Sequence, residues 1–343
     1  MNISKYILSQ FTTFVPHSVN TILSCSRSFL TPQIIQTNTM ANLPMPEPSA
    51  TNVAFTRYLY DKTEVLHSLL FALLDHNRHE ALFWAYELYY SGFEIELAEW
   101  LRWTYYVFYS EVDKWFCEFI EINLRRLHTL PIKEERDCII GTVVSNLAHR
   151  SYDIQAFVGH YMNLEFDRTT PKIHNHRIYI QFKPRDLEKY VTLSKPTTGR
   201  PRDYLKEVSH YPIRKSESLF LRKYVYASNE HVFTEDTVDP YLYNWLYYAG
   251  KSPIWKCRIS EYGGVLDNTE QVVAFPSDDQ AELFFEEYGY EPDEQSVEIH
   301  LLHGIDINQS GVFAEQCPHE FVFNYSDGRI CSIYGAKNDR SKL

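Results

Sequence analysis

Five side chains of the types that zinc prefers lie near the end of the sequence. They are His300, His303, Cys317, His319 and Cys331. Structural zinc takes four thiolate or imidazole ligands in a tetrahedral array. The spacing here matches no familiar zinc finger, so a zinc site would require these side chains to converge in the fold. The alternative is that they pack in the interior or lie on the surface as ordinary side chains.

Other patterns with possible chemistry are sparse. His174 and His176 would share one face of a strand, as two metal ligands can, but no third ligand is evident beside them. The chain has no Walker A loop, dinucleotide-binding glycine fingerprint, GxSxG elbow or HExxH motif. The sequence therefore favours a protein without catalytic activity, although an enzyme is not excluded.

Charge is segregated along the chain. The formal net charge is −12, and the segment 261–299 alone carries 12 acidic residues and no Lys or Arg. The segment 183–223 has 11 basic residues against 5 acidic ones. Such a basic segment can attract phosphates, which makes nucleic acid a candidate partner. The bases we expect to contact it are Lys183, Arg200, Arg202 and Lys206. The alternative is that the basic and acidic segments face each other or are merely solvated.

Aromatic residues are concentrated in one stretch, with twelve of them between residues 83 and 109. Successive residues of a helix face different directions, so one buried stripe cannot accommodate all of these rings. Exposed Trp and Tyr side chains often anchor protein partners. We therefore expect candidate anchors at Trp84, Tyr90, Trp100, Trp103 and Tyr106. The alternative is a thick core between helices, with tyrosine hydroxyls at its edge.

Helical spacing of apolar residues surrounds these aromatics. It predicts helices near 61–74, 81–89, 95–105, 115–124, 138–148 and 152–162, the first of them capped by Asp61 and the second ended by Gly92. Short polar joints between helices favour antiparallel neighbours. We therefore predict antiparallel helical hairpins, as a bundle or a short α-solenoid, over residues 59–165.

The remainder is expected to be less regular. Residues 166–240 are interrupted by prolines and include a strand-like run at 176–182. Residues 241–343 should form a small acidic α+β part packed on the helical array. It would contain a strand, turn and strand over 264–275, a helix over 281–288, and a second hairpin formed by 321–325 and 330–333.

The first residues differ in composition from the rest. No acidic residue occurs before Glu47, and Ser, Thr and Pro are frequent. We predict a loosely ordered extension over residues 1–58, and Met40 could serve as an alternative start, which leaves open whether residues 1–39 are present. The six cysteines include no CxxC pair, which favours reduced thiols, and no run is long and apolar enough to span a membrane.

Two blocks of sequence resemble an uncharacterised protein family of giant and other nucleocytoplasmic large DNA viruses. The first comprises 69–75 and 81–93, and the second comprises 244–248, 252–255, 262–264 and 288–295 in the same order. The resemblance covers about residues 66–303 and implies a viral product made in the host cytoplasm. It brings no established catalytic residues, so Trp245, Trp255 and residues 291–293 are interpreted as defining the fold.

Taken together, these features predict a non-enzymatic viral interaction or scaffold protein that binds another viral or host protein through aromatic-rich helical surfaces. One alternative is a metal-dependent enzyme of nucleic-acid processing, with zinc as a possible cofactor. Another is a minor structural component of the virion.

Overall fold

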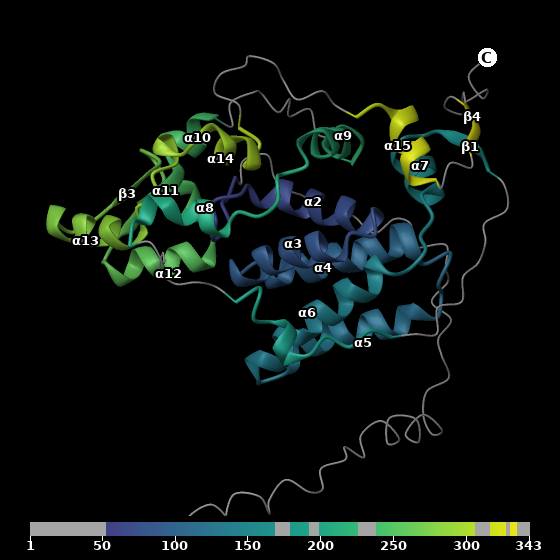
Figure 1. Ribbon diagram of the computed structural model, residues 1–343, viewed down its shortest axis with the longest axis horizontal. Coiled ribbons are helices and arrows are strands. Elements are labelled where there is room, and N and C mark those ends of the chain that lie inside the picture. The colour runs from purple at the N-terminus through teal and green to yellow at the C-terminus, as the bar shows by residue number, and fades with distance from the viewer. Residues whose placement is uncertain are drawn as a thin grey trace, which may run out of the picture. The chain divides into compact units, whose positions relative to one another are not determined.

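The computed structural model of the protein describes residues 53–168, 179–191, 199–225, 238–305, 316–326 and 330–334. Over these residues the chain is mainly helical, with two antiparallel two-stranded sheets, β1–β4 and β2–β3 (Figure 1). The predicted mainly α fold with small β elements is confirmed. None of the helices in these ranges is long and apolar enough to cross a membrane.

The helical array follows the predicted periodicity closely. It contains α2 (Lys62–Leu74), α3 (Arg78–Tyr90), α4 (Glu94–Thr104), the π-helical turn η3 (Tyr105–Tyr109), α5 (Phe116–Thr129), α6 (Lys133–Ala148) and α7 (Gln155–Tyr161). The Asp61 carboxylate caps α2 by accepting hydrogen bonds from the backbone N–H groups of Thr63 at 2.8 Å and Glu64 at 3.0 Å. Gly92, with a φ of +90°, ends the turn after α3, where a side chain would overlap Pro253.

Within the array, α2 packs on α3, α3 packs on α6, and α6 packs on α5 (Figure 1). Helix α2 is enclosed by its neighbours, because every residue from Thr63 to Leu74 is buried. Helix α9 covers α2 as well, and it supplies partners for buried polar groups of α2: Lys215 pairs with Glu64, and Ser218 bonds His67 at 2.7 Å.

The segments after the array are shorter. The middle contains η4 (Pro184–Asp186), η5 (Pro201–Asp203), α8 (Tyr204–Val208) and α9 (Lys215–Val225). The C-terminal part contains α10 (Val238–Leu242), α11 (Trp245–Ala249), α12 (Pro253–Glu261), β2 (Val265–Asp267), β3 (Val272–Ala274), α13 (Asp278–Tyr288), η6 (Pro292–Glu294), α14 (Val297–Leu302), α15 (Pro318–Tyr325) and β4 (Ile330–Tyr334). Strands β2 and β3 form the predicted hairpin, with Val265 opposite Ala274.

The second predicted hairpin is wrong. Residues 321–325 belong to α15, and β4 pairs instead with β1 (Glu165–Arg168) in antiparallel register. Pro318 occupies the first turn of α15, and the Cys317 sulfur accepts a hydrogen bond from the Glu320 N–H. Phe321, Val322 and Tyr325 are the buried residues of this helix and lie on one of its faces. From its sequence alone, the same run of residues is predicted to be a strand.

The predicted strand-like run at 176–182 is also not a strand where it is described. Residues 179–182 are extended without a strand partner, and residues 176–178 lie outside the described ranges, as do His174 and His176.

One hydrophobic core joins the described parts of the array, the middle and the C-terminal part. It begins before the predicted limit of residue 58, because Phe55 and Tyr58 are buried within it. The indole N–H of Trp255 donates to the Thr56 carbonyl at 3.0 Å and so fixes this entry segment to α12. Residues 1–52 lie outside the described ranges.

Candidate functional site

The three tryptophans predicted as surface anchors are interior. Trp84, Trp100 and Trp103 are buried, and the rings of Trp100 and Trp103 stack with their centroids 4.9 Å apart. The indole of Trp84 donates to Glu80 Oε1 at 3.2 Å, and that of Trp103 donates to the Tyr161 hydroxyl at 3.1 Å. These three residues therefore belong to a thick aromatic core between the helices, which was the alternative interpretation. They are too far inside to meet a partner.

The two predicted tyrosine anchors are half-buried and already bonded. Tyr90 donates to Asp137 Oδ2 at 2.9 Å, and Tyr106 donates to Glu121 Oε1 at 3.3 Å. Burial raises the pKa of both phenols, so they remain neutral donors. Both hydroxyls therefore tie neighbouring helices together.

The four basic candidates are on the surface. Among the described residues, two of them pair with neighbouring acids, so the four do not form one patch of free positive charge. Lys183 and Arg200 are exposed, Arg202 pairs with Glu294 at 2.8 Å, and Lys206 pairs with Asp203 at 3.3 Å. The more buried bases of the middle segment pair with acids of the helical array. They are Arg214 with Glu80 and Asp75, Lys215 with Glu64, and Arg222 with Asp61 and Glu64. Much of the local positive charge is thus matched inside the protein.

The predicted zinc ligands do not come together in the part of the chain that the structure describes. His300 and His303 are buried, whereas Cys317 and His319 are exposed at the start of α15. The side chain of Cys331, on β4, lies outside the described residues. Among the described side chains, no group of three His, Cys, Asp or Glu residues is placed to hold a metal ion.

The two buried histidines have structural partners instead. His303 lies with Nδ1 at 3.1 Å from the Leu59 carbonyl and Nε2 at 3.3 Å from Ser209 Oγ, and its ring stacks on Tyr60 at 4.1 Å. His300 Nε2 lies 2.7 Å from the Pro292 carbonyl. Burial lowers the pKa of His303 to about 3, so the ring is neutral and a weak base. The Ser209–His303 pair therefore links segments and is poorly suited to nucleophilic catalysis.

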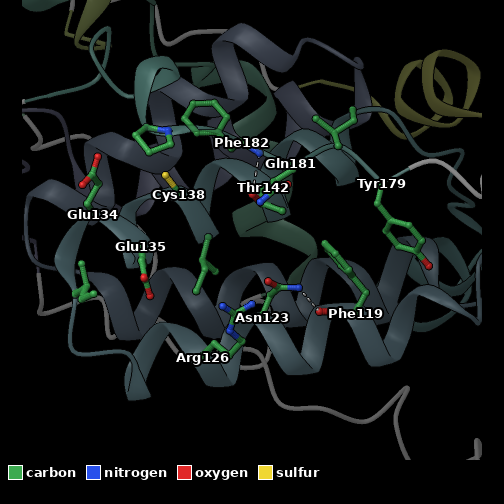
Figure 2. A pocket seen from close by; sticks show the side chains of 14 residues that line it. Phe119, Asn123, Arg126, Glu134, Glu135, Cys138, Thr142, Tyr179, Gln181 and Phe182 are labelled. Carbon is green, nitrogen blue, oxygen red and sulfur yellow. Dashed lines mark hydrogen bonds between the residues drawn. The ribbon is translucent and has the colours of Figure 1, made fainter. Parts of the chain in front are cut away.

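A groove with a volume of about 890 Å³ opens beside α5, α6 and the chain segment 179–184, which we call the strap (Figure 2). We call it the α5–α6 groove. Its lining residues are Phe119, Asn123, Arg126, Ile132, Glu134, Glu135, Cys138, Ile139, Thr142, Tyr179, Ile180, Gln181, Phe182 and Pro184. Its size and mixed apolar and polar lining are typical of ligand-binding sites.

Side chains of α6 hold the strap by bonding to its backbone. Asn146 accepts from the Ile180 N–H at 2.9 Å and donates to the Ile180 carbonyl at 2.6 Å, which satisfies both main-chain groups. Thr142 Oγ1 accepts from the Phe182 N–H at 3.0 Å (Figure 2). These bonds replace the ladder of a neighbouring strand, so an extended segment can lie on a helix with its polar groups satisfied.

Two further contacts fix the strap at its ends. Gly141 leaves room for the buried ring of Phe182, because an added Cβ would overlap that ring. At the other end, the Arg150 guanidinium lies 3.6 Å from the ring centre of Phe116 and 5.2 Å from that of Tyr179. Arg150 also donates to Asp113 Oδ2 at 3.0 Å. The groove wall is therefore built into the core.

Large apolar side chains remain exposed along the rim. Tyr179 is 51% exposed and packs on Phe119 with ring centres 5.0 Å apart, and Ile132 is 53% exposed. Trp115, the N-cap residue of α5, and Ile122 are 86% and 43% exposed. They do not line the groove themselves, but they lie one helical turn before and after the lining residue Phe119, so they share its side of the helix. We call Trp115, Ile122, Ile132 and Tyr179 the rim.

The rim was missed in the sequence, although α5 carries a signal of it. Phe116, Ile120 and Leu124 form the buried face at helical spacing. Trp115 and Ile122 fall on another side of the same helix. Apolar residues on two sides of a helix indicate either two neighbours or an uncovered face, and only the structure distinguishes these cases.

No protein-family model, curated protein or solved structure matches the chain. The groove is thus interpreted from its own chemistry. Among the described residues its lining combines aromatic and aliphatic walls with two amides, two hydroxyls and three charged groups, and it includes no histidine. Cys138, the thiol among the described lining residues, is less acidic than an ordinary cysteine because burial, first of all, raises its pKa. This thiol is therefore not activated as a nucleophile.

Proposed function

We propose that the protein is a non-enzymatic interaction or scaffold protein that holds a segment of a partner protein in the α5–α6 groove. The observation that carries this proposal is an open groove lined by the exposed Tyr179, with the exposed Trp115 one helical turn from the lining residue Phe119. Tryptophan and tyrosine dominate the binding energy of protein interfaces, because each buries a large area with few rotatable bonds.

The construction of the groove supports the same function. The strap is held by hydrogen bonds from α6 and by the Phe182 ring seated over Gly141. A preformed wall reduces the ordering cost of binding, so more of the contact energy contributes to affinity. A rigid helical frame with an open groove is what a scaffold requires.

An origin in a large DNA virus, with the host cytoplasm as the place of action, belongs to this proposal. Its support is the sequence resemblance over residues 66–303. The partner would then be another viral protein or a host protein.

The test is affinity capture with the full chain, comparing the unaltered protein with the double variant Trp115→Ala/Tyr179→Ala. We expect a stoichiometric partner that the double variant loses. The matched control is Tyr243→Ala/Phe323→Ala, which removes two aromatic side chains that are 76% and 64% exposed elsewhere. This control should retain the partner.

The proposal is contradicted if no stoichiometric partner is captured, or if both double variants lose it equally. Thermal unfolding of each variant shows whether a loss of binding reflects a loss of folding. Trp115, Tyr243 and Phe323 are largely exposed, so we expect each of these substitutions to change stability by no more than about 0.5 kcal/mol. Tyr179 also packs on Phe119 and Arg150, so its substitution should cost about 1 kcal/mol.

A further inference from the structure

The charged groups of the α5–α6 groove are not evenly placed. Glu134 and Glu135 lie in the first turn of α6, and Arg126 lies in the last turn of α5 (Figure 2). All three are exposed, and the charged side chains that line the groove sum to −1. The carboxylates therefore outnumber the base at the surface where a partner would dock.

The two glutamates lack a basic side-chain partner within the described part of the chain, although the N-terminus of α6 favours their negative charge. Neither forms an ion pair there, whereas nearby acids do: Glu121 pairs with Arg102 at 3.0 Å. Lys133, the base adjacent in sequence, extends over the Tyr90 ring at 5.7 Å. Glu134 and Glu135 thus remain available for a cation supplied from outside.

Cys138, which lines the groove, lies close enough to these carboxylates for their charges to act on its thiol. After burial, the groups that most raise its pKa are the carboxylates of Glu134, Asp137, Asp186 and Glu135. Each of these disfavours a negative charge at that position. The end of the groove near α6 consequently favours a cation.

We propose that the occupant of the α5–α6 groove is an apolar segment of a partner protein that carries a lysine or arginine beside its apolar residues. This inference rests on the proposed function and names the partner chemistry. The apolar side chains would pack on Phe119, Ile139 and the rim, and the basic group would lie at Glu134 and Glu135.

The two parts of such a segment have different effects. Burial of the rim supplies affinity, since apolar area removed from water is the main favourable contribution. An exposed ion pair contributes little by itself, but charge complementarity suppresses partners of the wrong sign and speeds association. The glutamates should therefore act mainly on selectivity.

The test uses two fluorescein-labelled synthetic peptides with the same leucines and one tryptophan. One carries lysines at the flanking positions and the other carries glutamates. Fluorescence anisotropy with the full chain should show that the lysine peptide binds at least about 10-fold more tightly, which is the effect of about 1.4 kcal/mol.

Charge variants then locate the interaction. Glu134→Gln/Glu135→Gln should weaken the lysine peptide about 3-fold to 10-fold, in the range expected for partly screened pairs. The matched control Glu282→Gln/Glu286→Gln makes the same change in net charge at exposed positions on α13, and it should leave binding unchanged. Arg126→Gln should leave lysine-peptide binding equal or tighter.

Two results would overturn the inference. One is equal binding of the two peptides, and the other is equal weakening by the α13 control, which would mean attraction to the net charge of −12 alone. If partner capture still depends on Trp115 and Tyr179, the proposed function survives either result. Loss of that dependence removes the proposed function itself.

Discussion

At the scale of single residues, the side chains that looked most chemical are structural. His303 connects Leu59, Ser209 and Tyr60, which come from two distant parts of the chain. It can do so only while neutral, because a buried imidazolium would lose its hydration without a carboxylate to replace it. The residue thus stabilises the fold and makes that stability sensitive to pH.

We predict that the protein loses stability as the pH falls from about 6.5 to about 3. The pKa of His303 is about 3 in the folded chain, against 6.5 for an unperturbed histidine. The unfolded chain therefore binds a proton in this window that the folded chain does not, so the free energy of unfolding falls as the pH falls. The effect should reach a few kcal/mol, and urea unfolding at several pH values measures it.

His303→Gln should make that pH dependence shallower while lowering stability at pH 7 by about 1 to 2 kcal/mol through lost hydrogen bonds. Part of the slope should persist, because burial also lowers the pKa of His67. The exposed His319→Gln variant serves as the control. An unchanged slope in His303→Gln would contradict the assignment.

At the scale of elements, the strap shows how a helix can replace a strand as the partner of an extended segment. Asn146 bonds both main-chain groups of Ile180, and Thr142 bonds the Phe182 N–H. The missing side chain at Gly141 admits the Phe182 ring. A glycine inside a helix costs stability locally, and here the packing of Phe182 offsets it.

Gly141→Ala should therefore displace the strap. The added methyl group would overlap the Phe182 ring, and overpacking of this kind costs about 1 to 3 kcal/mol. We expect lower stability in urea and weaker binding of the lysine peptide. Gly159→Ala on α7 is the matched control, because nothing lies within 4 Å of its added Cβ. That variant should be neutral or up to about 1 kcal/mol more stable.

At the scale of the whole molecule, the basic middle segment closes on the helical array. Arg214 pairs with Asp75 and Glu80, residues more than 130 positions earlier in the sequence. Burial lowers the pKa of Arg214, but the hydrogen bonds and charges of the two carboxylates raise it by more, so Arg214 stays protonated. The basic segment is thus matched mainly by acids in and beside α2 and α3, and not by the acidic segment 261–299 that was expected to face it, although Arg202 does pair with Glu294.

Arg214→Met should destabilise the protein by about 2 to 3 kcal/mol, because Glu80 is only 6% exposed and would lose its cation. Arg202→Met removes a guanidinium from a pair whose side chains are about half exposed, and it should cost clearly less than Arg214→Met because water screens an exposed pair. Equal effects of the two substitutions would show that the Arg214 cluster is no stronger than a surface pair.

Much of the fold was predictable from the sequence, while the candidate site was not. The helices of the array, the Asp61 cap and the 264–275 hairpin follow from local periodicity and local hydrogen bonding. Residues 321–325 were misassigned because Phe-Val-Phe-Asn-Tyr fits both a strand and a helix over so short a run. Pro318 and the Cys317 cap favour the helix, and the pairing of β4 with β1 removes the proposed strand partner.

The sequence by itself determined the helical class, the extent of most helices and the segregation of charge, since each depends on residues close together in the chain. Only the tertiary structure decided that Trp84, Trp100 and Trp103 are interior while Trp115 and Tyr179 are exposed. Exposure depends on which distant segment covers each helical face. Which segment covers which face depends on how the whole core packs, and a short stretch of sequence does not contain that information.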